Sequence, residues 1–171
     1  MDLKSLAKKL WDSFNGSIDN EIRELYKFVQ ESNSIEDINR KPFDVEIEEL
    51  NKFMLLTIPT IDDLCHFVSV YEPNARLRTS YGDSVRVRTY IPPFGGPEIA
   101  TELESLLKIA PFLHPYDLHR SYEMLHPFTD CNGRSGRALW AWKTRDISRG
   151  FLLPWYFMSL EKAKGNEAHK K

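Results

Sequence analysis

The stretch from His126 to Arg137, HPFTDCNGRSGR, constrains this chain more than any other part of it. It places a histidine, a carboxylate, an Asn-Gly pair and two arginines within twelve residues. Pro127 disfavours helical backbone at the residue before it, so a helix must end near His126. The Asn-Gly pair is typical of a turn. We therefore predict a loop here, followed by a helix that begins at about Arg134.

The residue types in this loop suit a phosphate site. His126 can move a proton near neutral pH, and Asp130 offers the hard oxygen ligands that Mg²⁺ prefers. The backbone N–H groups of 131–133 would lie at a helix N-terminus, where the dipole attracts anions. Arg134 and Arg137 are three residues apart and share one helix face, from which both can hold a polyphosphate. Together these groups indicate nucleotidyl or phosphoryl transfer.

The stretch resembles the signature of the Fic family, HPFx(D/E)GNGRxxR. Every position matches except one, because Cys131 stands where the family has glycine. The resemblance extends from about Ser32 to about Leu160, and it implies a mainly α-helical Fic fold, a compact bundle with a small β-hairpin flap. It also implies a protein adenylyltransferase, which moves AMP from ATP to a Tyr, Ser or Thr hydroxyl of a target protein or of the chain itself.

The resemblance gives each residue of the loop a role. His126 matches the base that takes the proton from the target hydroxyl. Asp130 matches the acidic residue that binds Mg²⁺ between the phosphates of ATP. Arg137 matches the arginine that is associated with the γ-phosphate. The residues implied to bind the nucleotide phosphates are Cys131, Asn132, Gly133, Arg134 and Arg137.

Cys131 is the departure from the signature. Its side chain leaves the main-chain N–H in place, but a Cβ costs about 1 kcal/mol if the backbone here has positive φ. A thiol at a helix N-terminus is also expected to have a lowered pKa.

The segment from Val85 to Ile91 alternates apolar and polar residues and predicts the one clear strand of the chain. Within the Fic resemblance it matches the flap, which pairs with an extended segment of the target protein. An added strand would hold the target backbone and leave its side chain facing the base. The alternative is an ordinary hairpin that covers the core. The residues of this segment are Val85, Arg86, Val87, Arg88, Thr89, Tyr90 and Ile91.

Upstream, Ser32-Asn-Ser-Ile-Glu36-Asp37 resembles the inhibitory motif of the family, (S/T)xxxE(G/N), with Asp37 at the last position. It implies the class of Fic proteins that is inhibited by its own N-terminal region. In that class Glu36 would pair with Arg137 and occupy the arginine that should hold the γ-phosphate. The alternative is an ordinary carboxylate on a solvated helix face.

The rest of the chain is predicted to be mostly helical, in one domain over residues 1–171. Thr60 and Asp63 match a capping box, and Pro97 suits the first turn of a helix. The N-terminal inhibitory region is expected to span about 1–40, and a frayed charged tail about 161–171. The apolar stripes predict helices over about 3–14, 18–29, 32–38, 45–56, 61–71, 97–107, 115–125 and 134–150, and an apolar segment over 152–160.

Charge and composition limit the classes of partner that we expect for this chain. A net charge of −2 gives no electrostatic reason to expect a nucleic acid. No apolar run reaches membrane-spanning length and no secretory start is present, so we expect a cytoplasmic protein without a membrane partner. The target protein, the nucleotide base and the oligomeric state stay open. So do two other functions: transfer of a different nucleotide, phosphocholine or phosphate, and a non-catalytic binding module.

Overall fold

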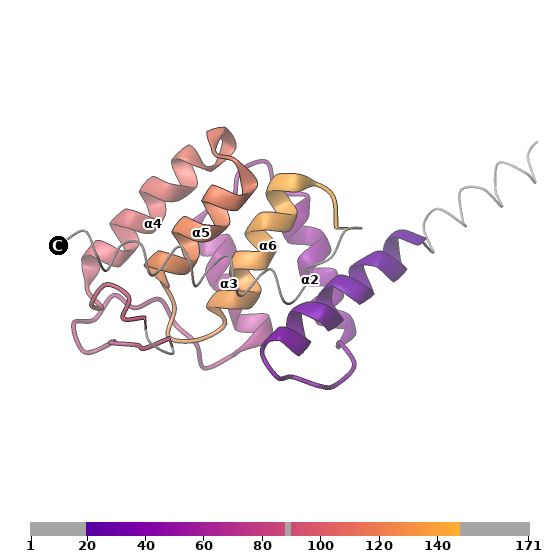
Figure 1. The fold of residues 1–171 in the computed structure, drawn as a ribbon, viewed down its shortest axis with the longest axis horizontal. Coiled ribbons are helices and arrows are strands. Elements are labelled where there is room, and N and C mark those ends of the chain that lie inside the picture. Colours follow the sequence, from indigo (N-terminus) through magenta and orange to yellow (C-terminus); the bar gives the residue numbers. More distant parts are fainter. Residues whose placement is uncertain (1–19, 88–89, 148–171) are drawn as a thin grey trace, which may run out of the picture.

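The structure is a computed structural model that describes residues 20–87 and 90–147 (Figure 1). These residues are mainly helical, as predicted, and they contain no strand but two isolated antiparallel bridges, Leu77–Phe128 and Val87–Tyr90. None of the helices described has the length and apolar character needed to cross a membrane. The helices are 20–35, α2 (Asp44–Met54), α3 (Ile61–Tyr71), α4 (Pro97–Ile109), the 3₁₀ turn η1 (Ala110–Phe112), α5 (Pro115–Leu125) and α6 (Asn132–Thr144).

Local sequence signals account for several helix starts. The Thr60 hydroxyl accepts the Asp63 N–H, and the Asp63 carboxylate accepts the Thr60 N–H at 2.8 Å, so the predicted capping box of α3 is confirmed. Pro97 and Pro115 each occupy the first turn of their helix, where the N–H that proline lacks would have no partner.

Two helix boundaries differ from the prediction. The helices expected over 18–29 and 32–38 are one continuous helix that reaches residue 35, and a turn with a left-handed Asp37 (φ 61°) follows it. Helix α6 begins at Asn132, two residues earlier than expected. The elements predicted over 3–14 and 152–160, and the charged tail, lie outside the described residues.

Helix α6 lies at the centre of the fold, between α5 and α2 (Figure 1). Its residues from Arg134 to Leu139 are all buried, which is expected of a helix surrounded by others. The neighbouring side chains of the core include Leu50, Phe53, Leu118 and Tyr122, each at most 1% exposed. The N-terminus of α6, which carries the signature, is therefore anchored by the hydrophobic core.

The loop before α6 is held by the chain at 76–78. The Arg78 N–H donates to the Pro127 carbonyl and the Thr129 N–H to the Arg76 carbonyl, each at 2.9 Å. These two bonds flank the bridge between Leu77 and Phe128. Phe128 is 1% exposed, so its side chain inserts into the core and holds the loop.

Gly136 allows α5 and α6 to pack closely. A Cβ at this position would lie 2.5 Å from Glu123 Oε1, 3.1 Å from the Tyr122 ring and 3.2 Å from His119 Cε1. All three residues are buried on α5, and burial lowers the pKa of His119 to about 4, so its imidazole is neutral there. This close contact leaves little room for a side chain at position 136 of α6.

The substitution Gly136→Ala is expected to lower the free energy of unfolding by about 1–3 kcal/mol, because the added methyl group must displace the buried Glu123 carboxylate and crowds Tyr122 and His119. This loss exceeds the gain of about 1 kcal/mol that alanine gives in helix propensity. Chemical denaturation measures the difference. Gly82→Ala is the control, since a Cβ there meets nothing within 4 Å. A Gly136→Ala protein at least as stable as the native one would contradict the close contact.

Candidate functional site

A cavity of about 610 Å³ lies at the N-terminal end of α6. Four separate parts of the chain form it: the signature loop, the segment at 85–87, the turn at 36–38 after helix 20–35, and Glu72 after α3. Arg137 and Ser32 do not line the cavity, and neither do Tyr90 and Ile91. Arg88 and Thr89 lie outside the described residues. The lining consists of Glu36, Ile38, Glu72, Val85, Arg86, Val87, His126, Thr129, Asp130, Cys131, Asn132, Gly133 and Arg134.

His126 is the C-cap of α5 and has the left-handed conformation, with φ 50° and ψ 61°. This conformation is uncommon for a residue with a Cβ and needs support from its surroundings. The His126 N–H donates to the Tyr122 carbonyl at 2.9 Å, and the His126 carbonyl accepts from Arg78 Nε at 2.7 Å. The half-buried imidazole thus stands at the helix-to-loop junction that the sequence predicted, and it lines the cavity.

The first turn of α6 presents N–H groups that have no acceptor within the helix. Those of Asn132, Gly133 and Arg134 belong to residues that line the cavity. The side chain of Asn132 has a different role: it accepts the Phe128 N–H at 2.8 Å and donates to the Phe128 carbonyl at 2.7 Å. Asn132 therefore closes the signature loop with its side chain, and only its main chain is available to an anion.

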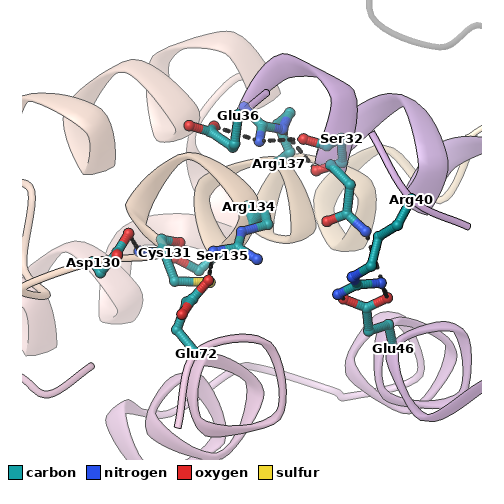
Figure 2. Close-up of polar contacts among 11 residues, drawn as sticks. Ser32, Glu36, Arg40, Glu46, Glu72, Asp130, Cys131, Arg134, Ser135 and Arg137 are labelled. Atoms are coloured by element: carbon teal, nitrogen blue, oxygen red, sulfur yellow. Dashed lines mark hydrogen bonds and ion pairs between the residues drawn. The ribbon is translucent and has the colours of Figure 1, made fainter. Parts of the chain in front are cut away.

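Asp130 accepts the Cys131 N–H at 2.6 Å (Figure 2). The neighbouring carboxylate thus already accepts this N–H, and a role for the N–H in binding the phosphates stays a prediction. The other oxygen of the exposed carboxylate is available to a cation at the edge of the cavity. In the described part of the chain no group of three or more His, Cys, Asp and Glu side chains could hold a metal. A single carboxylate nevertheless suits Mg²⁺, which keeps several waters and binds through one or two carboxylates and substrate phosphates.

Cys131 is the N-cap of α6 and has φ 65°, so the positive φ considered for this position is confirmed. Its side chain is buried, with 4% of the residue exposed. Burial raises the pKa of the thiol to about 12, although nearby Arg134 acts in the opposite direction. The predicted lowering of this pKa is wrong, because the loss of water around a thiolate outweighs the attraction of the helix terminus.

Arg137 is buried on α6 and binds the end of the N-terminal helix (Figure 2). Its Nε donates to Ser32 Oγ at 2.8 Å, and its Nη2 donates to the Ser32 carbonyl at 2.9 Å and to Glu36 Oε1 at 2.7 Å. The predicted pairing of Glu36 with Arg137 is confirmed. A Cβ on Gly133 would overlap Glu36 Oε1, so the Glu36 carboxylate lies directly against the first turn of α6.

Sequence reasoning missed Glu72, the C-cap of α3. Its Oε1 lies 2.6 Å from Arg134 Nη2 (Figure 2). The Arg134 side chain is 3% exposed, and its Nε and Nη1 have no acceptor among the described residues. Glu72 thus orients this arginine and leaves two buried donors for an anion. No signal marks Glu72 in the sequence, because it lies 62 residues from Arg134 and looks like any carboxylate that follows a helix.

The predicted strand over 85–91 is not formed in its described residues. Val87 and Tyr90 exchange both backbone hydrogen bonds at 2.9 Å, so the chain reverses inside this segment and not only after it. The Tyr90 hydroxyl donates to the Met124 carbonyl at 2.7 Å and ties the segment to α5. Val85, Arg86 and Val87 line the cavity, while the role of the segment as a flap stays a prediction.

No protein-family model matches this chain, and no curated protein matches it. The Fic resemblance therefore rests on the residues of the signature alone.

The raised pKa and burial of Cys131 predict an unreactive thiol. We expect iodoacetamide at pH 8 to modify it about a hundredfold more slowly in the native protein than in denaturant, since little thiolate is present. Peptide mass spectrometry over time measures this rate, with the half-buried Cys65 as the internal control. Rapid labelling of Cys131 in the native protein would show that the thiol faces the cavity.

Proposed function

We propose that this chain is a protein adenylyltransferase with a Fic fold, inhibited by its own Glu36. The observation that carries the proposal is the position of the Glu36 carboxylate. It is an anion bound to Arg137 and placed against the first turn of α6, where backbone N–H groups and the helix dipole favour a phosphate. We place the reaction in the cytoplasm.

The residues around the cavity account for the chemistry of the transfer. His126 accepts the proton of the target hydroxyl, whose oxygen then forms a bond to the α-phosphorus of ATP as pyrophosphate leaves. Asp130 would hold Mg²⁺, which neutralises charge on the phosphates. The N–H groups of the first turn of α6 and the spare donors of Arg134 bind the phosphate oxygens. Catalysis here consists of positioning and electrostatic stabilisation.

Inhibition follows from competition for one guanidinium. Arg137 has two of its nitrogens committed to Ser32 and Glu36, and it is 1% exposed, so it cannot turn toward another partner. A γ-phosphate at this place would meet the Glu36 carboxylate as a like charge at short range. ATP therefore binds productively only when Glu36 moves away. The side chain of Glu36 is 39% exposed, which leaves it a path into solvent.

The substitution Glu36→Gly is expected to raise the transfer rate by about ten- to a hundredfold, the equivalent of one charge-assisted hydrogen bond. The assay supplies each labelled nucleotide in turn to the purified protein and to cell lysate, and measures labelled protein. Adding Arg137→Ala to Glu36→Gly should cancel the gain, because the arginine that is set free orients the γ-phosphate. Glu21→Gly is the control, since it makes the same change at an exposed position of helix 20–35, the helix that precedes Glu36.

An unchanged rate in a folded Glu36→Gly protein would remove the inhibitory role. Labelling by a nucleotide other than ATP would assign the site to a different transfer. If no nucleotide labels protein with either the native or the Glu36→Gly chain, the result would favour the alternative of a non-catalytic binding module.

His126→Ala in the Glu36→Gly background is expected to lower the transfer rate by about a hundredfold or more, while the affinity for ATP stays within about twofold. The reason is that a general base acts on the proton transferred in the transition state, whereas other groups bind the phosphates. Side-by-side measurements of ATP binding and product formation separate the two effects. His66→Ala is the control, because this exposed histidine on α3 pairs with Glu49 outside the cavity. Transfer at an undiminished rate would exclude His126 as the base.

A further inference from the structure

Arg78 is among the largest side chains that are completely buried, with 0% exposed. Its hydrogen bonds go to backbone carbonyls rather than to a carboxylate. Nε donates to His126 at 2.7 Å, and Nη2 donates to Leu125 at 3.0 Å. Nη1 donates to Pro93 at 2.9 Å and to Asp83 at 3.1 Å. A buried charge is costly unless its donors are satisfied, and these four bonds satisfy all three nitrogens.

The carbonyls of Leu125 and His126 belong to the end of α5. The last carbonyls of a helix have no partner within it, and they carry the negative end of the dipole, so a cation is favoured there. The main chain of Arg78 adds a further bond, from its N–H to the Pro127 carbonyl at 2.9 Å. Arg78 thus binds three consecutive carbonyls, one before His126, one on it and one after it.

The other two carbonyls lie on either side of the segment at 85–91. Asp83 precedes this segment and Pro93 follows it, and the Arg78 carbonyl also accepts the Gly96 N–H at 2.9 Å. One guanidinium therefore joins both ends of the segment to the backbone that carries His126. This arrangement sets the separation between the histidine and the part of the cavity wall formed by Val85, Arg86 and Val87.

We propose that Arg78 is a positioning residue for the transfer reaction. It holds His126 in the left-handed conformation that directs the imidazole into the cavity, and through Asp83 and Pro93 it fixes the cavity wall at 85–87 to the same backbone. The proposal rests on the proposed function for its catalytic consequence. Its structural core, control of His126 by Arg78, stands on the hydrogen bonds alone.

Arginine is required at this position because of its geometry. The guanidinium is a rigid planar fork with five N–H donors, and it reaches acceptors in several directions at once. A lysine has its donors on one nitrogen at the end of a flexible stem, and it cannot span the carbonyls of both α5 and the 85–91 segment. Arg78→Lys therefore keeps the positive charge but loses the hydrogen bonds that join the end of α5 to Asp83 and Pro93.

The test compares Arg78→Lys with Arg76→Lys, both in the Glu36→Gly background. Arg76 is the matched control: its side chain is 66% exposed and pairs only at its tip with Asp83. We expect Arg78→Lys to lower kcat at least about tenfold with ATP affinity within about twofold, as for loss of one group that orients the base. Arg76→Lys should leave both quantities within about twofold. Equal kcat in the two variants would overturn the proposal.

A readout without activity separates this proposal from the proposed function. In protein labelled with ¹⁵N-histidine, Arg78→Lys should shift the imidazole signals and the titration midpoint of His126, and Arg76→Lys should leave them in place. Unmoved His126 signals in a folded Arg78→Lys protein would overturn the proposal, whether or not any nucleotide is transferred. If Arg78→Lys does not fold, the proposal is tested by NMR on the native protein. Its Arg78 Nε–H should exchange slowly with water and show NOE contacts to His126, whereas rapid exchange without such contacts would contradict the proposal.

Discussion

The buried guanidinium of Arg137 is the constraint on which the site depends. An arginine at 1% exposure must find acceptors inside the protein, and the end of helix 20–35 supplies them through Ser32 and Glu36. This pairing joins the N-terminal helix to the central helix α6. A second, partly buried ion pair fixes the chain that follows: Glu46 accepts both terminal nitrogens of Arg40, at 2.8 and 2.7 Å (Figure 2). The turn at 36–37 is therefore held by two ion pairs, that of Glu36 itself with Arg137 and that of Arg40, shortly after the turn, with Glu46.

The two arginines of the signature differ in how fully their nitrogens are hydrogen-bonded. Arg137 has its Nε and Nη2 engaged by the N-terminal region, whereas Arg134 is held by Glu72 through Nη2 alone. A buried donor without an acceptor is destabilising, and Arg134 has two that find no acceptor within residues 20–87 and 90–147. An anion in the cavity would remove that cost, and the first turn of α6 offers it further donors. Arg134 thus has donors to spare for an anion, whereas Arg137 is engaged by Ser32 and Glu36, and the proposed inhibition depends on this difference.

Short-range features of the structure were predictable from the sequence. The capping box at Thr60 depends on residues within one turn, and so do the prolines that begin α4 and α5, and the end of α5 before Pro127. The signature brought His126, Asp130 and the first turn of α6 into one prediction, and the geometry places them on one cavity.

Features that depend on tertiary packing were not predictable. Glu72 becomes relevant only because α3 ends beside α6, and Arg78 lies in a segment rich in charged residues, where burial is not expected. The pKa of Cys131 was predicted in the wrong direction, because the sequence shows the helix terminus but not the burial of the thiol. The segment at 85–91 has the alternation of a strand, yet Val87 pairs with Tyr90 inside it, and no neighbouring strand in the described residues extends the pairing.

The claim that Glu36 occupies a phosphate site is tested most directly by a crystal structure of the Glu36→Gly protein with Mg²⁺ and a non-hydrolysable ATP analogue. The account predicts a terminal phosphate within hydrogen-bonding distance of Arg137, in the space that the Glu36 carboxylate fills in the native protein. It also predicts the α-phosphate within reach of His126. A nucleotide that binds away from Arg137, or an Arg137 that keeps its place on Ser32 and contacts no phosphate, would contradict it.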